Sequence, residues 1–338
     1  MKELEIAGKK VQPRTKEIVK VHVTKDLTTD IDIYAHVVAG KEDGPTLLLL
    51  SMLHGEEWFS VLILKKVLER IDPLKLKGNI IAVPVANPTA FLTGSRTVLD
   101  NSDEPDANRS FGSKFQWITS QITNAIEDNF IKNADYLIDY HLGGWGVTMA
   151  DVGFRNENSE IAHKSRAMTF AFGYPMLHVK QGVSSPRSSV GFSELKYGIP
   201  GIVAGIGGLG FGEEKEKEWL DENVQGTLGV MKQLGMLAGS PKYCDEYLFI
   251  TDYWRVHPKC GGYIETLVGI ERQFTEVKKG ELLANIYSTT TFELLEELRS
   301  PGEGVIFYMC RSYMVRPGGW AFGIAITEGK KSYWSSRK

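Results

Sequence analysis

The chain is poor in cysteine and has no long apolar run. Its 338 residues include three cysteines, Cys244, Cys260 and Cys310, which are odd in number and widely spaced. Such a set indicates neither a disulfide framework nor a CxxC metal site. No apolar run approaches the roughly 18 residues that a membrane span needs. We therefore expect a protein with no membrane contact, folded around an ordinary apolar core.

An excess of positive charge is also missing. The formal net charge is −3 and the pI is about 6.2, so we do not expect nucleic acid as a partner. Residues 1–16 are polar and lack the apolar segment of a secretion signal. The simplest interpretation is a soluble cytoplasmic protein. A homo-oligomer is compatible with the sequence, which does not specify the oligomeric state.

Hydrophobic periodicity predicts alternating strands and helices in the first 240 residues. The last predicted helix contains Gly226, Gly229 and Gly235, which weaken that prediction. Strands that alternate with helices predict an α/β domain over residues 1–240, with a mixed sheet flanked by helices. The predicted strands are 46–52, 79–86, 135–140 and 201–206, and the predicted helices are 58–71, 115–131, 159–172 and 216–237.

The pattern changes near residue 240. Beyond this point, short β-like segments are separated by glycine and proline, as in CGGYIETLVG and VRPGGWAFGIAI. This texture predicts a small all-β domain over residues 241–338.

The segment LLLLSMLHGEEWFSVLILKK contains the clearest chemical motif. It places His54 and Glu57 between the end of a strand and the start of a helix, where ligands of α/β sheets gather. A spacing of three residues lets both side chains point at one ion. Catalytic zinc typically takes two histidines and one carboxylate and keeps one position open. His141, which also follows an apolar strand, is the best candidate for the third ligand.

The structural alternative is a histidine that caps the helix or lies on the surface. An HxxE pattern alone occurs often by chance, and it is the matching His141 that favours a metal site. We expect the other histidines to be structural or solvated; they are His22, His36, His163, His178 and His257.

Residues 87–112 form a long polar stretch with two arginines. Polar loops of this length in a compact domain are often functional. Arg96 and Arg109 can bind a carboxylate or polarise a carbonyl beside a metal. Composition alone favours the other interpretation, that they are two surface arginines.

Four short motifs in one order resemble the succinylglutamate desuccinylase/aspartoacylase family of the zinc carboxypeptidase superfamily. The family pattern is HGxE, then NP followed by Arg, then DLNRxF, then DxH near a strand end. The matching segments are His54-Gly55-Glu56-Glu57, Asn87-Pro88 with Arg96, Asp106-Ala107-Asn108-Arg109 and Tyr140-His141-Leu142-Gly143. The C-terminal segments are similar to that family's β-domain, which resembles a lipoyl-type barrel.

The resemblance implies a role for each matching residue. His54, Glu57 and His141 would hold one zinc ion per chain, and Arg96 would polarise the scissile carbonyl. Asn108 and Arg109 would bind the substrate carboxylate. The implied activity is hydrolysis of the amide of a small N-acyl amino acid or a related acylated compound.

One position departs from the family pattern. The family has a general-base glutamate in a strand of the form GIPAxTxELGG, and here the strand reads GIPGIVAGIGG, so Gly205 takes its place. A general base is typically worth about 10²–10⁴-fold in rate. Either the base was removed by engineering, or another carboxylate replaces it, or the chemistry is different. The candidate replacements are Glu56, Glu194, Glu213, Glu214 and Glu265.

Three functions therefore remain open. The first is a zinc-dependent amide hydrolase, the second is another zinc-dependent reaction on a related small molecule, and the third is a zinc or ligand-binding protein that turns over poorly. Turnover of N-acyl amino acids separates the first from the others. Any turnover at all separates the second from the third.

Overall fold

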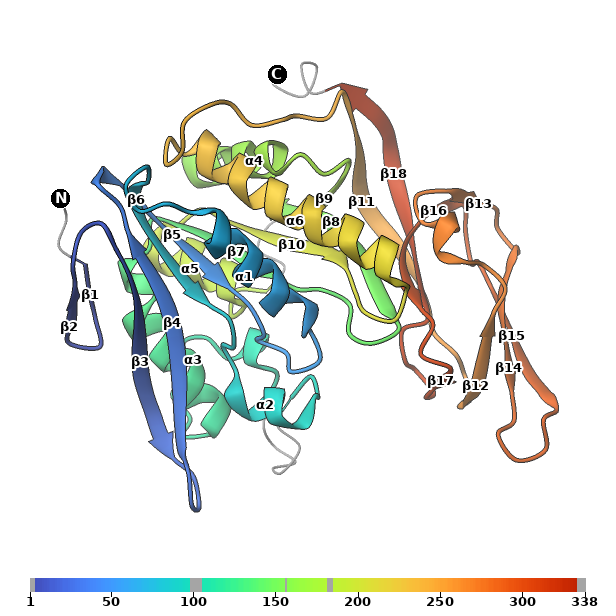
Figure 1. Cartoon of the computed structure of the whole chain (residues 1–338). Coiled ribbons are helices and arrows are strands. Elements are labelled where there is room, and N and C mark those ends of the chain that lie inside the picture. Colours follow the sequence, from blue (N-terminus) through green and yellow to red (C-terminus); the bar gives the residue numbers. More distant parts are fainter. Residues whose placement is uncertain (1–3, 98–104, 156, 181–184, 333–338) are drawn as a thin grey trace.

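The computed structural model describes residues 4–97, 105–155, 157–180 and 185–332, and its largest feature is a twelve-stranded mixed sheet (Figure 1). The sheet strands in chain order are β3 (Thr15–Lys25), β4 (Asp30–Ala39), β5 (Glu42–Leu50), β6 (Lys77–Val83), β7 (Tyr136–Tyr140), β8 (Val147–Arg155), β9 (Met176–Lys180), β10 (Gly201–Gly207), β11 (Glu246–Val256), β13 (Glu276–Val277), β16 (Gly304–Cys310) and β18 (Phe322–Ser332). Their order across the sheet is β13-β16-β18-β11-β9-β8-β10-β7-β5-β6-β4-β3. A separate hairpin joins β1 (Leu4–Ile6) to β2 (Lys9–Val11).

The middle of this sheet is parallel and covered on both faces. β5 runs parallel to β6 on one side and to β7 on the other, and β10 continues parallel to β7. Leu47 and Leu49 belong to one apolar core, and Leu48 and Leu50 belong to the other. Successive side chains of a strand point to opposite faces, so an unbroken apolar run is what a doubly covered strand requires.

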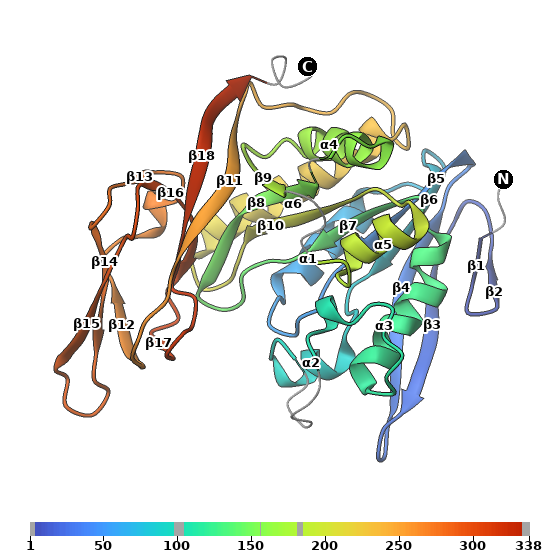
Figure 2. The same cartoon turned by 180° about the vertical axis from the view of Figure 1, so that it is seen from behind.

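Six helices supply the covering layers among the described residues. They are α1 (Phe59–Arg70), α2 (Pro88–Thr93), α3 (Ile118–Asn129), α4 (Glu160–Phe172), α5 (Ser189–Tyr197) and α6 (Glu213–Gln233). α1, α4 and α6 share one apolar core with the sheet, whereas α3 and α5 share the other (Figures 1 and 2). The predicted mixed α/β fold with flanking helices is therefore confirmed.

Every strand and helix predicted for the first 240 residues is present, with ends shifted by a few residues. The pattern did not predict the antiparallel pair β3 and β4, or β8, β9 and α5. Gly226 and Gly229 do not interrupt α6, because they lie where it packs on α4, whereas Gly235 lies beyond its end with a φ of +71°. A Cβ on Gly226 would come within 2.3 Å of the Phe172 ring, and one on Gly229 within 2.2 Å of the Ala171 carbonyl oxygen.

Beyond α6, all regular elements of the described chain are strands apart from one short 3-10 helix. β11, β13, β16 and β18 extend the large sheet, and a second sheet contains β12 (Gly262–Thr266), β14 (Leu282–Tyr287), β15 (Leu294–Arg299) and β17 (Met314–Val315). A third apolar core lies among these strands. The boundary at residue 240 and the lipoyl-like barrel stay predictions.

No helix in the described part of the chain has both the length and the apolar character needed to cross a membrane.

Candidate metal centre and active-site cavity

The three predicted metal ligands come together at the ends of two adjacent parallel strands. His54 follows β5, Glu57 precedes α1, and His141 directly follows β7. Parallel strands end at the same edge of a sheet, which brings the three loops together. All three residues are buried, with exposed fractions of 2%, 3% and 8%.

Both imidazole rings turn the same nitrogen toward Glu57. Nδ1 of His54 lies 2.8 Å from Glu57 Oε1, and Nδ1 of His141 lies 3.2 Å from the same oxygen. One potential ligand atom from each of the three residues lies within 4.8 Å of the others. The group can therefore present two nitrogens and one carboxylate to a single cation.

The arrangement fits zinc. Tetrahedral zinc with bonds of about 2.0–2.1 Å holds its ligand atoms roughly 3.3 Å apart, and the two distances to Glu57 Oε1, 2.8 Å and 3.2 Å, are close to this value. Glu57 Oε2 is buried and has no hydrogen-bond partner among the described residues. Since an unpartnered buried carboxylate oxygen is costly, a bound cation would stabilise it.

One further carboxylate lies against the far side of each imidazole. Asp106 Oδ1 lies 3.0 Å from Nε2 of His54, and Asp139 Oδ2 lies 2.8 Å from Nε2 of His141. The hydroxyl of Ser189 also donates to Asp139. A carboxylate on the distal nitrogen fixes the ring and leaves Nδ1 free to bind metal, which is the usual outer shell of a zinc site.

The charges of this cluster stabilise one another against the cost of burial. Burial alone would raise the pKa of Glu57, but the charges of His141 and His54 outweigh it and lower this pKa to about 2. Burial would lower the pKa of His141, but Asp139 and Glu57 raise it to about 10. The site is therefore built for positive charge.

The other predicted site residues lie beside this cluster. The Arg96 guanidinium donates to Asp106 Oδ2 through Nε at 3.1 Å and Nη2 at 2.8 Å. Asn108 Nδ2 lies 2.9 Å from His141 Nε2, and its Oδ1 accepts from the Ser189 amide. Arg109 is exposed and donates to the Asn108 carbonyl. Their predicted roles toward substrate stay predictions.

A cavity of about 850 Å³ opens over the cluster. Its walls come from the sheet ends, from α5 and its preceding loop, and from the C-terminal strands β11 and β16. Arg96, Arg109 and Arg255 bring positive charge to the lining, and Glu56 and Asp151 bring negative charge. The cavity can therefore take a small molecule that carries both signs of charge.

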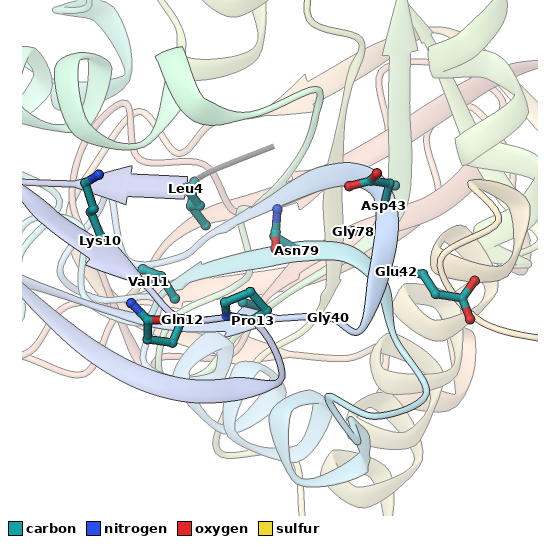
Figure 3. A pocket seen from close by; sticks show the side chains of 12 residues that line it. Leu4, Lys10, Val11, Gln12, Pro13, Gly40, Glu42, Asp43, Gly78 and Asn79 are labelled. Carbon is teal, nitrogen blue, oxygen red and sulfur yellow. The ribbon is translucent and has the colours of Figure 1, made fainter. Parts of the chain in front are cut away.

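A second cavity of about 310 Å³ lies between the β1–β2 hairpin, the start of β5 and the start of β6 (Figure 3). Neither histidine nor cysteine is among the described residues that line it. Among the described residues, the group of three side chains that could hold a metal lines the large cavity.

Gly205 lies in the wall of the large cavity, next to His141 on one side and Asp151 on the other. It is paired with Asp151 across β10 and β8, and the amide of His141 donates to the neighbouring Ala204 carbonyl. Asp151 Oδ2 lies 3.2 Å from Nδ1 of His178, which is also in the cavity wall.

Of the five glutamates considered as replacements for the base, four lie outside this cavity. Glu213, Glu214 and Glu265 are exposed elsewhere. Glu194 is buried, accepts from Ser165 and pairs with Arg155. Glu56 does line the cavity, and burial followed by the charge of Glu57 raises its pKa.

Sequence reasoning assigned no role to Asp106, Asp139 or Asp151, and it expected His178 to be structural or solvated. The first two stand inside the matching motifs, Asp139 as the first residue of the DxH pattern, so a signal was present. Asp151 and His178 belong to strands that the pattern did not predict. Their place in the cavity follows from strand pairing alone.

Comparisons with known proteins identify a family and a fold for this chain. The family model for the succinylglutamate desuccinylase/aspartoacylase catalytic domain matches residues 43–225, more than half of the chain. The N-alpha-acetyl-L-2,4-diaminobutyric acid deacetylase of Halomonas elongata is 24% identical over 277 residues, which is 80% of this chain and 78% of the relative.

Two solved structures share the whole fold. A succinylglutamate desuccinylase from Silicibacter sp. TM1040 superposes with a TM-score of 0.80 at 20% identity, over 97% of this chain and all of the other. The product-bound ectoine utilisation protein EutE (DoeB) from Ruegeria pomeroyi gives 0.79 at 21% identity, over 93% and 95% of the two chains. At these identities the likeness shows the fold.

Proposed function

Because the chain belongs to the succinylglutamate desuccinylase/aspartoacylase family, we propose that it is a zinc-dependent hydrolase that cleaves the amide of a small N-acyl amino acid. The family model covers the segments that hold His54, Glu57 and His141. The proteins that this chain resembles are named as enzymes that remove acyl groups from small acylated amino acids.

The observation that carries the proposal is the group formed by His54, Glu57 and His141. Two imidazole Nδ1 atoms and one buried carboxylate converge, and each imidazole has a carboxylate on its other nitrogen. Two histidines and one carboxylate with an open fourth position are the ligand set of hydrolytic zinc. One zinc per chain, when bound, would polarise the carbonyl and activate water.

The chain's own charged groups would bind and orient the substrate. Arg109, which is exposed in the cavity wall, and Asn108 beside it are proposed to hold the substrate carboxylate. Arg96, in contact with the Asp106 carboxylate at the edge of the cluster, is proposed to stabilise the developing oxyanion.

The size and charge of the cavity favour a small zwitterionic substrate. Its volume of about 850 Å³ falls within the range of ordinary small-molecule sites, roughly 300–1,000 Å³. The deacetylase of Halomonas elongata is named for an acetylated diamino acid, which carries a free amine and a carboxylate. We therefore propose N-acetylated amino acids, with diamino acids first among them, as the substrate class.

The test is hydrolysis of a panel of N-acetyl amino acids, followed as release of acetate and free amine. We expect turnover that a chelator abolishes and that zinc restores. The variants His54→Ala and His141→Ala should lose stoichiometric zinc, measured by metal analysis, and should lose turnover with it. Stoichiometric zinc in both variants would refute the ligand assignment, and no turnover of any N-acyl amino acid would refute the hydrolase.

A further inference from the structure

Gly205 and Asp151 face each other across a pair of antiparallel strands. The register of β10 and β8 places them directly opposite. Residues in such a position project from the same face of the sheet, with Cβ atoms roughly 4.5–5.5 Å apart. The Asp151 carboxylate therefore points toward the side of the sheet on which a side chain at position 205 would project.

The Asp151 carboxylate lies about as far from a Cβ at position 205 as the carboxylate of a glutamate there would. Its Oδ1 lies 3.5 Å from the point where a Cβ on Gly205 would be. In a glutamate, the carboxylate oxygens lie roughly 3–3.5 Å from the residue's own Cβ, by ordinary bond lengths. Two carboxylates this close would also repel each other. Glycine at position 205 therefore leaves room for the Asp151 carboxylate and avoids this repulsion.

The Asp151 carboxylate is buried, and only one of its two oxygens has a hydrogen-bond partner among the described residues. The residue is 6% exposed, and its Oδ2 is taken by His178 at 3.2 Å. Its Oδ1 is buried and has no hydrogen-bond partner among the described residues. Burying such an oxygen without a partner is costly, so a partner that enters the cavity, such as water, would be favoured there.

From this geometry we propose that Asp151, held by His178, is the general base that Gly205 does not provide. The inference rests on the proposed amide hydrolysis. Asp151 Oδ1 takes a proton from the attacking water as the water oxygen bonds to the acyl carbon. The same proton passes to the leaving nitrogen as the C–N bond breaks. The carboxylic acid formed gives its proton to the freed amine, so the products are a carboxylate and an ammonium ion, and no further reactant is needed.

Glu56 is the rival among the carboxylates of the cavity wall, and it also has an unpartnered oxygen. Glu56 directly precedes the metal ligand Glu57, and its side chain lies against Gly144, not opposite Gly205. Asp151 instead lies beside the position from which the family's base acts, with a histidine to orient it. This difference favours Asp151.

The experiment compares Asp151→Asn, Asp151→Glu and Glu56→Gln in the zinc-loaded protein. We expect Asp151→Asn to lower kcat by about 10²–10⁴-fold with KM changed only a few-fold. Its zinc content should stay at one per chain, and calorimetry should show intact N-acetyl substrate bound at full stoichiometry. Asp151→Glu, which keeps a carboxylate, should recover part of kcat, and Glu56→Gln should lower kcat less than tenfold.

The outcomes separate this inference from the function on which it rests. If the unaltered protein hydrolyses the substrate and Asp151→Asn is equally active, Asp151 is not the base although the hydrolase stands. A large loss in Glu56→Gln with none in Asp151→Asn gives the role to Glu56. Loss of zinc or of substrate binding in Asp151→Asn, or no recovery in Asp151→Glu, makes Asp151 structural. If the unaltered protein turns over no N-acyl amino acid, both proposals fall.

Discussion

At the scale of single residues, His141 is fixed by its neighbours before any metal binds. Its Nε2 is 2.8 Å from Asp139, which is fully buried and also receives the Ser189 hydroxyl. The ring can therefore present Nδ1 to a metal without having to reorient. A ligand that is already oriented loses little conformational freedom on binding.

We therefore expect Asp139→Asn to weaken zinc binding by about 10–100-fold, the usual effect of losing such an outer carboxylate. Competition with a chelator would measure it. The matched control is Asp128→Asn on α3, which removes an exposed carboxylate paired with Lys132. Equal zinc affinity in both variants would contradict the role given to Asp139.

Gly205 has a steric role besides its place opposite Asp151. A Cβ there would come within 2.9 Å of the His141 carbonyl oxygen, which belongs to the backbone and cannot swing away. We expect Gly205→Ala to lose about 1–3 kcal/mol of stability, as overpacking does, together with some zinc affinity. Denaturant unfolding and metal analysis would show both.

Gly201→Ala is the control in the same strand. Its nearest neighbour would be the Val190 side chain at 3.0 Å, which can adjust by rotation. The loss of stability should be smaller and zinc affinity should be unchanged. If Gly201→Ala disturbs zinc as much as Gly205→Ala does, the close approach to His141 is not the cause.

At the scale of elements, helix α6 carries a carboxyl group, that of Glu222, whose ionised form is disfavoured by burial. Burial first, and then the charge of Glu218 one turn before it, raises the pKa of Glu222 to about 7. A carboxyl whose folded pKa lies above its unfolded value of about 4.5 favours folding while it is protonated. That contribution is lost as pH rises through about 7, so the native protein should be less stable at pH 8 than at pH 5.5 on this account.

Glu222→Gln should therefore stabilise the protein at pH 8, by about 1–2 kcal/mol after allowance for solvent screening, and much less at pH 5. Thermal or urea unfolding at the two pH values would measure the difference. Asp221→Asn, an exposed neighbour on the same helix, should have no such pH-dependent effect. A gain in stability of equal size at both pH values would show that the buried charge of Glu222 is not its cause.

At the scale of the whole molecule, the C-terminal strands complete the structure that the first 240 residues begin. β11 pairs in parallel with β9, and β16 pairs with β8, so the large sheet continues through the predicted boundary (Figure 2). Phe249, Val305 and Phe307 from these strands are buried in the core that α1, α4 and α6 cover. Tyr253, Arg255 and Trp320 line the large cavity.

We expect a chain shortened to residues 1–240 to lose cooperative folding. Each apolar side chain that is removed from the core contributes about 1.5–3 kcal/mol, and three of them approach the whole stability of a typical domain, about 5–15 kcal/mol. The edge of β9 would also be exposed. Calorimetry of the shortened chain against the full chain is the measurement, and a sharp transition near that of the full chain would show that residues 1–240 form an independent unit.

The sequence by itself determined the elements whose hydrophobic pattern is strong and local. The apolar run before His54 predicted β5, the helical spacing after Glu57 predicted α1, and the strand before His141 predicted β7. The metal cluster followed because strand ends of a parallel sheet meet at one edge. Each of these inferences needed only short-range pattern and a general rule of sheet geometry.

The tertiary structure alone decided the place of Asp151 and His178, and with it the candidate for the base. Asp151 is more than 50 residues before Gly205 in the chain, and only the pairing of β10 with β8 sets them opposite each other. A shift of one residue in that register would turn the Asp151 side chain to the other face of the sheet. Such a register depends on the packing of the entire sheet, and no local pattern contains it.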